Sequence, residues 1–112
     1  MAPPPAVLSL GACRDRTVDD SLDGRLRRIL DTVGKVETIV SKDQMPVCLG
    51  GEHSLTTAPL RVLAERYPDL AVLHLDAHAD LRESYGGSPL SHACVMRNVY
   101  KLGLRSVSVG VR

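Results

Sequence analysis

Short apolar runs alternate along this chain with stretches of helical spacing. Four runs have the length and composition of strands: 7–10, 46–49, 70–75 and 105–110. Three stretches place apolar residues three or four positions apart, as helices do: 21–40, 57–67 and 91–102. Strand and helix alternate from residue 46 onward, and right-handed crossovers then require a parallel sheet covered by helices. The pattern predicts an α/β fold.

The same spacing predicts which residues are buried. The first helix is expected to bury one stripe: Leu22, Leu26, Ile29, Leu30 and Val33. The second is expected to bury Leu60, Leu63, Ala64 and Tyr67, and the third Ala93, Met96, Val99 and Tyr100. The apolar run 70–73 predicts a buried strand, as in parallel sheets. Residues 1–5 include three prolines and predict a flexible lead.

Composition narrows the class of protein. A chain of 112 residues with 44% apolar and 24% charged residues has the size and balance of one globular domain. A net charge of +1 without a basic block gives no reason to expect nucleic acid as a partner. No apolar run reaches the length of a membrane span. Residues 10–13 have the shape of a lipoprotein cleavage site, but no basic segment precedes them, and three irregularly spaced cysteines favour free thiols in the cytoplasm.

Two of the predicted strands are followed by side chains that can bind metals. Asp76, His78 and Asp80 occupy every second position after the third strand. Alternate residues of an extended segment point to the same side. His53 follows the preceding strand after a glycine turn. Because the carboxyl ends of parallel strands border one crevice, we expect these four side chains to converge.

The donor types indicate the class of metal. Carboxylates with one or two imidazoles suit Mn²⁺, Fe²⁺ or Zn²⁺ at a catalytic position, whereas a structural zinc site contains thiolates. A lone Asp or His after a strand is more often an ordinary loop residue, but the D-x-H-x-D run joined to G-G-x-H favours a metal centre. His74 shares the alternation but lies within the strand, so we interpret it as a packed residue that supports the ligands rather than as a ligand. Glu52 is expected to point away from His53.

Three motifs together resemble the agmatinase branch of the ureohydrolase (arginase/agmatinase) family: Gly50–Ser54 (GGEHS), Asp76–Asp80 (DAHAD) and Ser91–Arg97 (SHACVMR). The resemblance covers residues 46–112 and implies an arginase-like, three-layer α/β/α fold with a parallel sheet, of which this chain is a truncated N-terminal portion. Residues 1–112 are then one partial ureohydrolase domain, whose βαβαβ part at 46–112 carries the motifs. The family hydrolyses guanidino compounds, uses two Mn²⁺ ions and commonly forms homo-oligomers.

The resemblance also implies a role for each matched residue. His53 would bind the first ion, His78 the second, Asp76 both, and Asp80 the first. A hydroxide bridging the ions would attack the guanidinium carbon, and Asp80 would carry its proton to the leaving amine. His92 is similar to the family's loop histidine, which shuttles protons or contacts substrate. The implied reaction converts agmatine to putrescine and urea, a step of polyamine biosynthesis.

Other interpretations stay open. The family's second aspartate motif is not found in this sequence. By the resemblance, the first ion keeps three protein ligands here and the second, incomplete site keeps two. The chain is therefore either an enzyme or a catalytically incompetent fragment that binds metal or a subunit. Arginase or guanidinobutyrase specificity is another alternative, and so is a zinc deacetylase, whose fold is similar.

Overall fold

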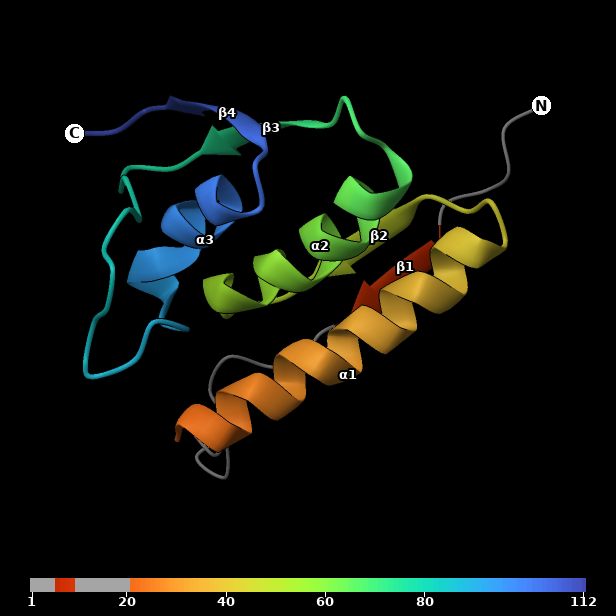
Figure 1. Ribbon diagram of the computed structural model, residues 1–112, viewed down its shortest axis with the longest axis horizontal. Coiled ribbons are helices and arrows are strands. Elements are labelled where there is room, and N and C mark those ends of the chain that lie inside the picture. The colour runs from red at the N-terminus through yellow and green to blue at the C-terminus, as the bar shows by residue number, and fades with distance from the viewer. Residues whose placement is uncertain (1–5, 10–20) are drawn as a thin grey trace.

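The described residues, 6–9 and 21–112 of a computed structural model, form four strands and three α-helices (Figure 1). The strands are β1 (Ala6–Ser9), β2 (Pro46–Leu49), β3 (Ala71–Leu75) and β4 (Arg105–Val109). The helices are α1 (Leu22–Ser41), α2 (Thr57–Arg66) and α3 (Val95–Lys101), and 3₁₀ turns η1 (His53–Thr56) and η2 (His92–Cys94) precede α2 and α3. The expected flexible lead and the run 10–13 lie outside the described residues.

The strands pair as two parallel ladders. β1 pairs with β2 from Ala6 opposite Pro46, and β3 pairs with β4 from Ala71 opposite Arg105. The expected α/β fold with parallel strands is confirmed, but β2 and β3 are not hydrogen-bonded to each other within the described part of the chain. Two ladders therefore replace the single sheet expected from residue 46 onward, and side chains that follow β2 and β3 still come together in one cluster.

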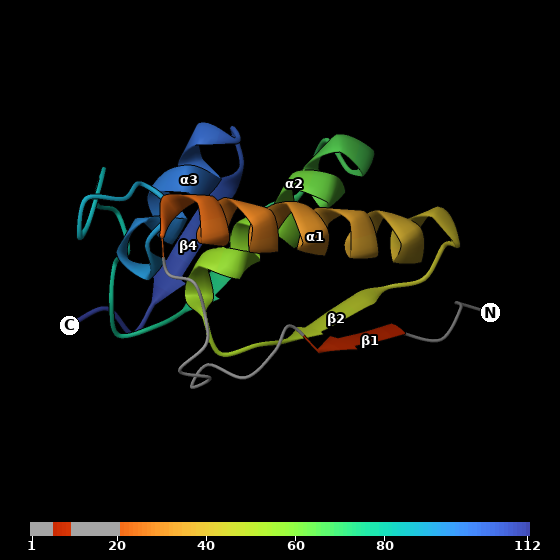
Figure 2. The same ribbon diagram turned by 90° about the horizontal axis from the view of Figure 1, so that it is seen from below.

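The helices lie together on one side of the strands. Figure 2 shows α1, α2 and α3 in one layer, with β1 and β2 beneath them. A three-layer fold would add a second layer of helices on the other side of the strands. The described residues do not include such a layer. None of the three helices is both long and apolar enough to cross a membrane.

The expectation that β3 is buried holds for one face only. Val72 packs against the cluster on α3, and His74 beside it is 6% exposed. The opposite face carries Leu73 and Leu75, which are 66% and 71% exposed, because none of the described helices lies over it. Val107, opposite Leu73 on β4, is 63% exposed and extends this apolar face.

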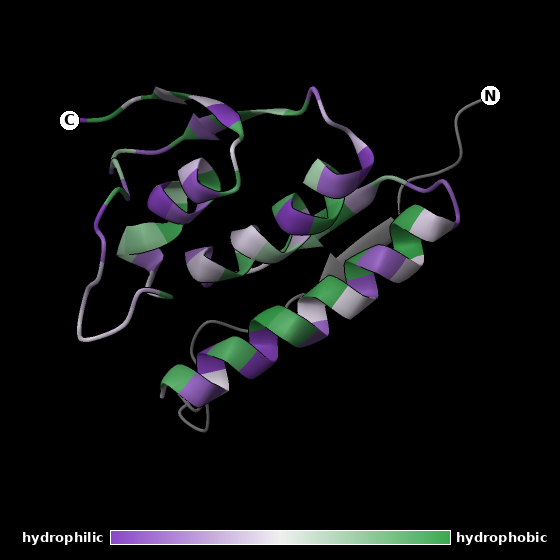
Figure 3. Ribbon diagram, in the orientation of Figure 1, coloured by the Kyte–Doolittle hydropathy of each residue, from purple (hydrophilic) through white to green (hydrophobic). Residues whose placement is uncertain are grey.

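α1 is one continuous helix, so Gly34 does not interrupt it. Ser21 caps its start by accepting a hydrogen bond from the Gly24 N–H at 3.1 Å. Apolar and hydrophilic residues alternate along the helix in Figure 3. This alternation leaves a narrow face for packing against α2, with Val36 and Val40 buried beside Val62.

Several residues expected in the core are exposed instead. Leu22, Leu26 and Leu30 are 50%, 44% and 56% exposed, because α2 covers the neighbouring face of α1, where Ile29 is buried. Half-buried Val33 packs against that cluster as expected.

Two tyrosines were also assigned wrongly to the core. Tyr67 follows the last residue of α2 in an extended conformation and is 49% exposed. Tyr100 lies on the outer side of α3, with the Arg97 guanidinium 5.8 Å from its ring centre. The fully buried residues of these helices include Ala58 and Val95.

Glu83 ties the loop after β3 to α3. Its carboxylate accepts hydrogen bonds from the Lys101 ammonium, at 3.1 Å, and from the Arg97 guanidinium. These two cations, Lys101 first, hold the pKa of Glu83 below its ordinary value. A depressed carboxyl pKa contributes stability above the pKa of the unfolded chain, and this contribution is lost as the pH falls through the folded pKa.

We therefore expect Glu83→Gln to lower the free energy of unfolding at about pH 7, and the difference from the parent to shrink as the pH falls through the lowered pKa of Glu83. Urea denaturation across this pH range measures the difference. Glu65→Gln, which removes the same charge from the exposed side of α2, is the control and should show a smaller dependence on pH. Equal pH profiles for the parent and Glu83→Gln would contradict the expectation.

Candidate metal centre

Four side chains bring their metal-binding atoms into one cluster: His53, His74, Asp76 and Asp80. The four atoms all lie within 4.8 Å of one another. His53 Nδ1 is 2.9 Å from Asp80 Oδ2 and 3.7 Å from Asp76 Oδ2. An ion with bonds of about 2.0–2.2 Å separates its ligand atoms by similar distances. The spacing therefore fits a single divalent ion.

The position of Asp76 follows from the pairing of β3 with β4. Its backbone N–H continues the ladder by donating to the Val109 carbonyl at 3.1 Å. Its carboxylate Oδ1 accepts a hydrogen bond from the His78 backbone N–H at 2.8 Å. This backbone bond, followed by the side chains of His78 and His74, lowers the pKa of Asp76 despite some desolvation. The carboxylate is thus held ionised, with Oδ2 left for the cluster.

Asp80 is fixed by its own backbone. Its φ of 53° is left-handed, a region that Asp adopts more readily than most residues. In this conformation its carbonyl accepts from the N–H groups of Met96 and Arg97, at 2.9 and 3.2 Å, in the first turn of α3. The carboxylate is only 8% exposed and lies beside His53. Strained backbone of this kind is concentrated at functional sites.

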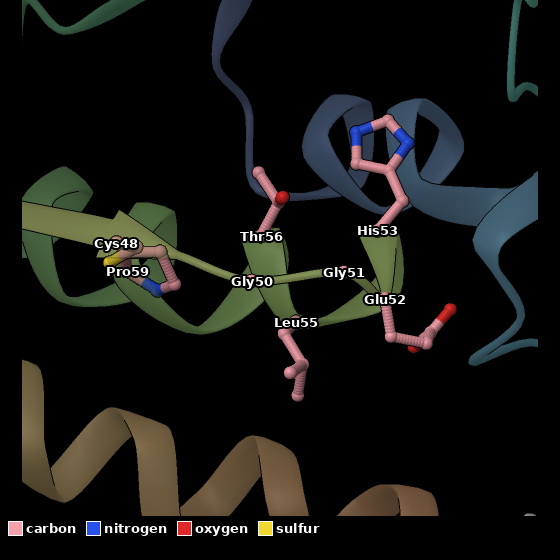
Figure 4. Close-up of a pocket in the computed structure, with 8 residues that line it drawn as sticks. All are labelled: Cys48, Gly50, Gly51, Glu52, His53, Leu55, Thr56 and Pro59. Atoms are coloured by element: carbon pink, nitrogen blue, oxygen red, sulfur yellow. The ribbon is translucent and has the colours of Figure 1, made fainter. Parts of the chain in front are cut away.

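His53 comes from the turn between β2 and α2. Figure 4 shows its imidazole on the opposite side of the backbone from the Glu52 carboxylate, as expected. Leu55 extends from the same 3₁₀ turn toward α1, where it packs against Ile29. The His53 ring stacks on His74, with 5.6 Å between ring centres and 20° between planes. The core under α1 and the His74 ring together position His53.

His74 is the member of the cluster that sequence reasoning left out of the ligand set. It is buried, as expected of a packed residue, but its Nε2 lies 3.3 Å from Asp76 Oδ2 and 3.7 Å from Asp80 Oδ2. Its place in the His74–Asp80 alternation was the available signal. A residue inside a strand usually lies too deep to reach a site at the strand end, so the alternation alone indicates a packed residue.

His78 and His92 lie at the edge of the cluster. His78 is 80% exposed and contacts Asp76 Oδ1, at 3.1 Å, on the side away from Oδ2. His92 is also exposed, and its ring meets Tyr85 edge to face at 5.5 Å. Both residues line an open hollow of ≈ 340 Å³ together with His53 and the two carboxylates. The structure brings His53, Asp76 and Asp80 together and places His78 and His92 at the border of the same hollow.

The donor set fits a divalent ion. The His53 nitrogen and two carboxylate oxygens, without a thiolate, match Mn²⁺, Fe²⁺ or Zn²⁺ at a catalytic position, and the His74 imidazole lies beside them. The buried Nε2 of His74 has no well-aligned hydrogen-bond partner among the described residues, and it faces the two carboxylates. Two carboxylates and an unpaired imidazole nitrogen at such short distances are stabilised when a cation lies among them.

Gly110 supports the site from the end of β4. Its φ of +96° is left-handed, and a Cβ there would lie 3.3 Å from the Asp76 carbonyl oxygen. We expect Gly110→Ala to lower the free energy of unfolding by about 1–2 kcal/mol and also to weaken metal binding, because the added methyl pushes on the Asp76 backbone. Thermal denaturation and a Mn²⁺ titration measure the two effects.

Gly103→Ala is the matched control. Gly103 has a φ of +77°, but a Cβ there meets nothing within 4 Å. It should lose stability through backbone strain and keep its metal affinity. Equal losses of affinity in both variants would contradict a specific role for Gly110.

Comparison with known proteins gives concordant matches. The model of the Arginase family matches residues 8–112. The agmatinase of Bacillus cereus is 43% identical over 93 residues, which is 74% of this chain and 32% of that protein. The agmatinase of Pyrococcus horikoshii is 35% identical over 107 residues, 96% of this chain and 36% of that protein. The solved structure of an agmatine ureohydrolase from Thermoplasma volcanium matches with a TM-score of 0.72 at 34% identity, over 84% of this chain and 31% of that one. The chain thus spans about a third of the length of the curated relatives it matches.

Proposed function

The chain belongs to the arginase family, and from this premise we propose that it carries the metal-binding half-site of an agmatinase-like ureohydrolase. The proposed reaction is hydrolysis of a guanidino compound, agmatine to putrescine and urea. The observation that carries the proposal is the convergence of His53, Asp76 and Asp80 at the edge of one open hollow. The agmatinase names of the matched relatives support the choice of substrate.

The proposed metal is Mn²⁺. His53, Asp76 and Asp80 would hold one ion, and Asp76 and His78 would contribute to a second. Bound Mn²⁺ would supply the reaction with a water that ionises near neutral pH. Among the described residues, the cluster offers no further ligand that would complete the second site.

The chain's own residues would bind substrate and move protons. The Asp80 side chain is nearly buried beside the hollow, so its carboxylate is placed to accept a proton and to pass it to the departing amine. His92 stands at the border of the hollow, and its edge-to-face contact with Tyr85 orients the imidazole. We propose His92 as a substrate contact or proton shuttle there.

The proposal extends to the setting of the protein. Cys48 and Cys94 are free thiols, which suits the cytoplasm, where thiols stay reduced.

Homo-oligomer formation is proposed from the resemblance to the family. The exposed apolar face of β3 and β4 is a surface that a neighbouring subunit could cover.

The test is a metal count with urea release on the same sample. The chain is loaded with Mn²⁺, bound ions per chain are counted, and urea and amine are measured from agmatine, arginine and 4-guanidinobutyrate. We expect metal-dependent release of urea and putrescine from agmatine, abolished by a chelator and by Asp76→Asn. Faster release of urea from arginine would assign arginase specificity instead. Zn²⁺-dependent deacetylation without urea would contradict the proposed function.

A second candidate is metal binding without turnover. It is favoured by the single four-atom cluster found among the described residues. Bound Mn²⁺ with no urea from any of the three compounds would support this candidate and contradict turnover by the 112-residue chain.

A further inference from the structure

His74 connects the two strands that frame the site. It pairs in register with Ser108 on β4, and its Nδ1 is 3.0 Å from the Ser108 hydroxyl oxygen. The opposite ring nitrogen, Nε2, is directed at the Oδ2 atoms of Asp76 and Asp80. The imidazole therefore lies between a hydroxyl on one strand and the carboxylates that follow the other.

Burial makes this contact chemically significant. His74 is 6% exposed, and its Nε2 has no aligned hydrogen-bond partner among the described residues. A buried imidazole nitrogen without a partner is unfavourable, because water cannot replace the missing bond. The nearest group that can supply one is Asp76 Oδ2, at 3.3 Å.

The surroundings also select the tautomer of the ring. Ionised carboxylates only accept hydrogen bonds, so a lone pair on Nε2 would face two negative oxygens, whereas an N–H there would be attracted to them. Nδ1 must then accept, and the Ser108 hydroxyl can donate to it. The stacked His53 ring limits rotation of the imidazole on its other side.

We propose that His74 is a positioning residue. The Ser108 hydroxyl fixes the Nε2–H tautomer, and Nε2–H holds Oδ2 of Asp76 in the orientation that binds the ion. His74 acts through Asp76 and is not itself a ligand. This inference rests on the metal centre of the proposed function, but it concerns a residue outside the ligand set.

The tautomer is measured first. Long-range ¹H–¹⁵N correlation spectra of the metal-free chain report which ring nitrogen of His74 carries the proton, independently of metal binding and of activity. The proposal expects the proton on Nε2. A proton on Nδ1, with the Nε2 lone pair facing the carboxylates, would overturn it and would make His74 a ligand candidate instead.

Metal affinity is measured second, by Mn²⁺ titration of the 112-residue chain and its variants. His74→Leu removes the donor and should weaken binding by about 10–100-fold, the loss typical of groups that orient metal ligands. His74→Gln, whose amide N–H can replace Nε2–H, should recover most of that affinity. A ring that serves only to fill space would not be replaced by an amide, so equal losses in both variants would overturn the proposal.

Ser108 provides a test of the connection. Ser108→Ala should weaken Mn²⁺ binding by about two- to tenfold in the parent and cause no further loss in His74→Leu, because its effect passes through the ring. Ser106→Ala is the matched control, since Ser106 lies on the same strand but pairs with Val72. An independent loss from Ser108→Ala in the His74→Leu background would contradict the connection.

The two proposals fail in different ways. If the parent binds Mn²⁺ but releases no urea, the proposed turnover is contradicted. The expected order of Mn²⁺ affinities among the His74 and Ser108 variants would still hold. Unchanged Mn²⁺ affinity in His74→Leu, in a chain that melts like the parent, would overturn the role of His74 whatever the activity.

Discussion

Replacing Asp80 with asparagine is expected to lower the Mn²⁺ affinity by more than about 100-fold, beyond the loss typical of groups that only orient ligands. The substitution is nearly isosteric and removes one of the two carboxylates in the cluster. Asparagine tolerates a left-handed backbone as well as aspartate does, so the φ of 53° should be retained. The carbonyl contacts with the first turn of α3 involve only the backbone and should survive. Urea release should fall with the affinity.

The measurement is a Mn²⁺ titration combined with a denaturation curve. Asp69→Asn removes the same charge from an exposed position between α2 and β3 and serves as the control. We expect the control to bind Mn²⁺ like the parent and Asp80→Asn to melt at or above the parent's temperature without metal, because a carboxylate beside Asp76 is removed. If Asp80→Asn binds Mn²⁺ as tightly as the parent does, Asp80 is not a ligand of this site.

Met96→Ala is expected to cause the largest loss of stability, about 2–5 kcal/mol. Met96 is 4% exposed and packs with Val95 and Val99 against Val72 of β3. Truncation leaves a cavity in the only cluster that holds α3 on this ladder among the described residues. For a chain whose total stability is of the order of 5–15 kcal/mol, this is a large fraction.

Urea denaturation of Met96→Ala measures the change in the free energy of unfolding. Tyr100→Ala is the control on the same helix, because Tyr100 is 68% exposed, and we expect it to lose less than about 1 kcal/mol. The Met96 variant should also bind Mn²⁺ more weakly, since the first turn of α3 holds the Asp80 carbonyl. Similar stabilities for the two variants would show that α3 is not packed as described.

The sequence predicted the elements more accurately than their packing. Local signals determine where elements begin and end: Ser21 begins α1, and Gly103, at a φ of +77°, follows α3. Which face of a helix is covered depends on its neighbours, so Leu26 was assigned to the core although α2 covers a different face. Strand pairing is likewise a property of the whole fold, and periodicity could not separate one sheet from two ladders.

The candidate site was predictable where short spacing decides it. Asp76 and Asp80 follow one strand, and a glycine turn brings His53 to the same edge, so their convergence followed from the motif. The place of His74 could not be obtained in this way. The alternation with Asp76 places His74 on the same side of the chain, but the contact of its Nδ1 with Ser108, 34 residues later, comes from the pairing of β3 with β4, which no local pattern reports.

The two hydrogen bonds to the Asp80 carbonyl make the amides of Met96 and Arg97 reporters of the centre. Their exchange with deuterated solvent requires an opening that releases Asp80 from α3. An ion held by the Asp80 carboxylate must dissociate in that opening, so binding adds its free energy to the opening of both amides. At a free Mn²⁺ concentration of 100 times the dissociation constant, their exchange should slow by about 100-fold, equivalent to about 2.7 kcal/mol. Occupancy of the centre could then be followed from a helix that contributes none of its ligands.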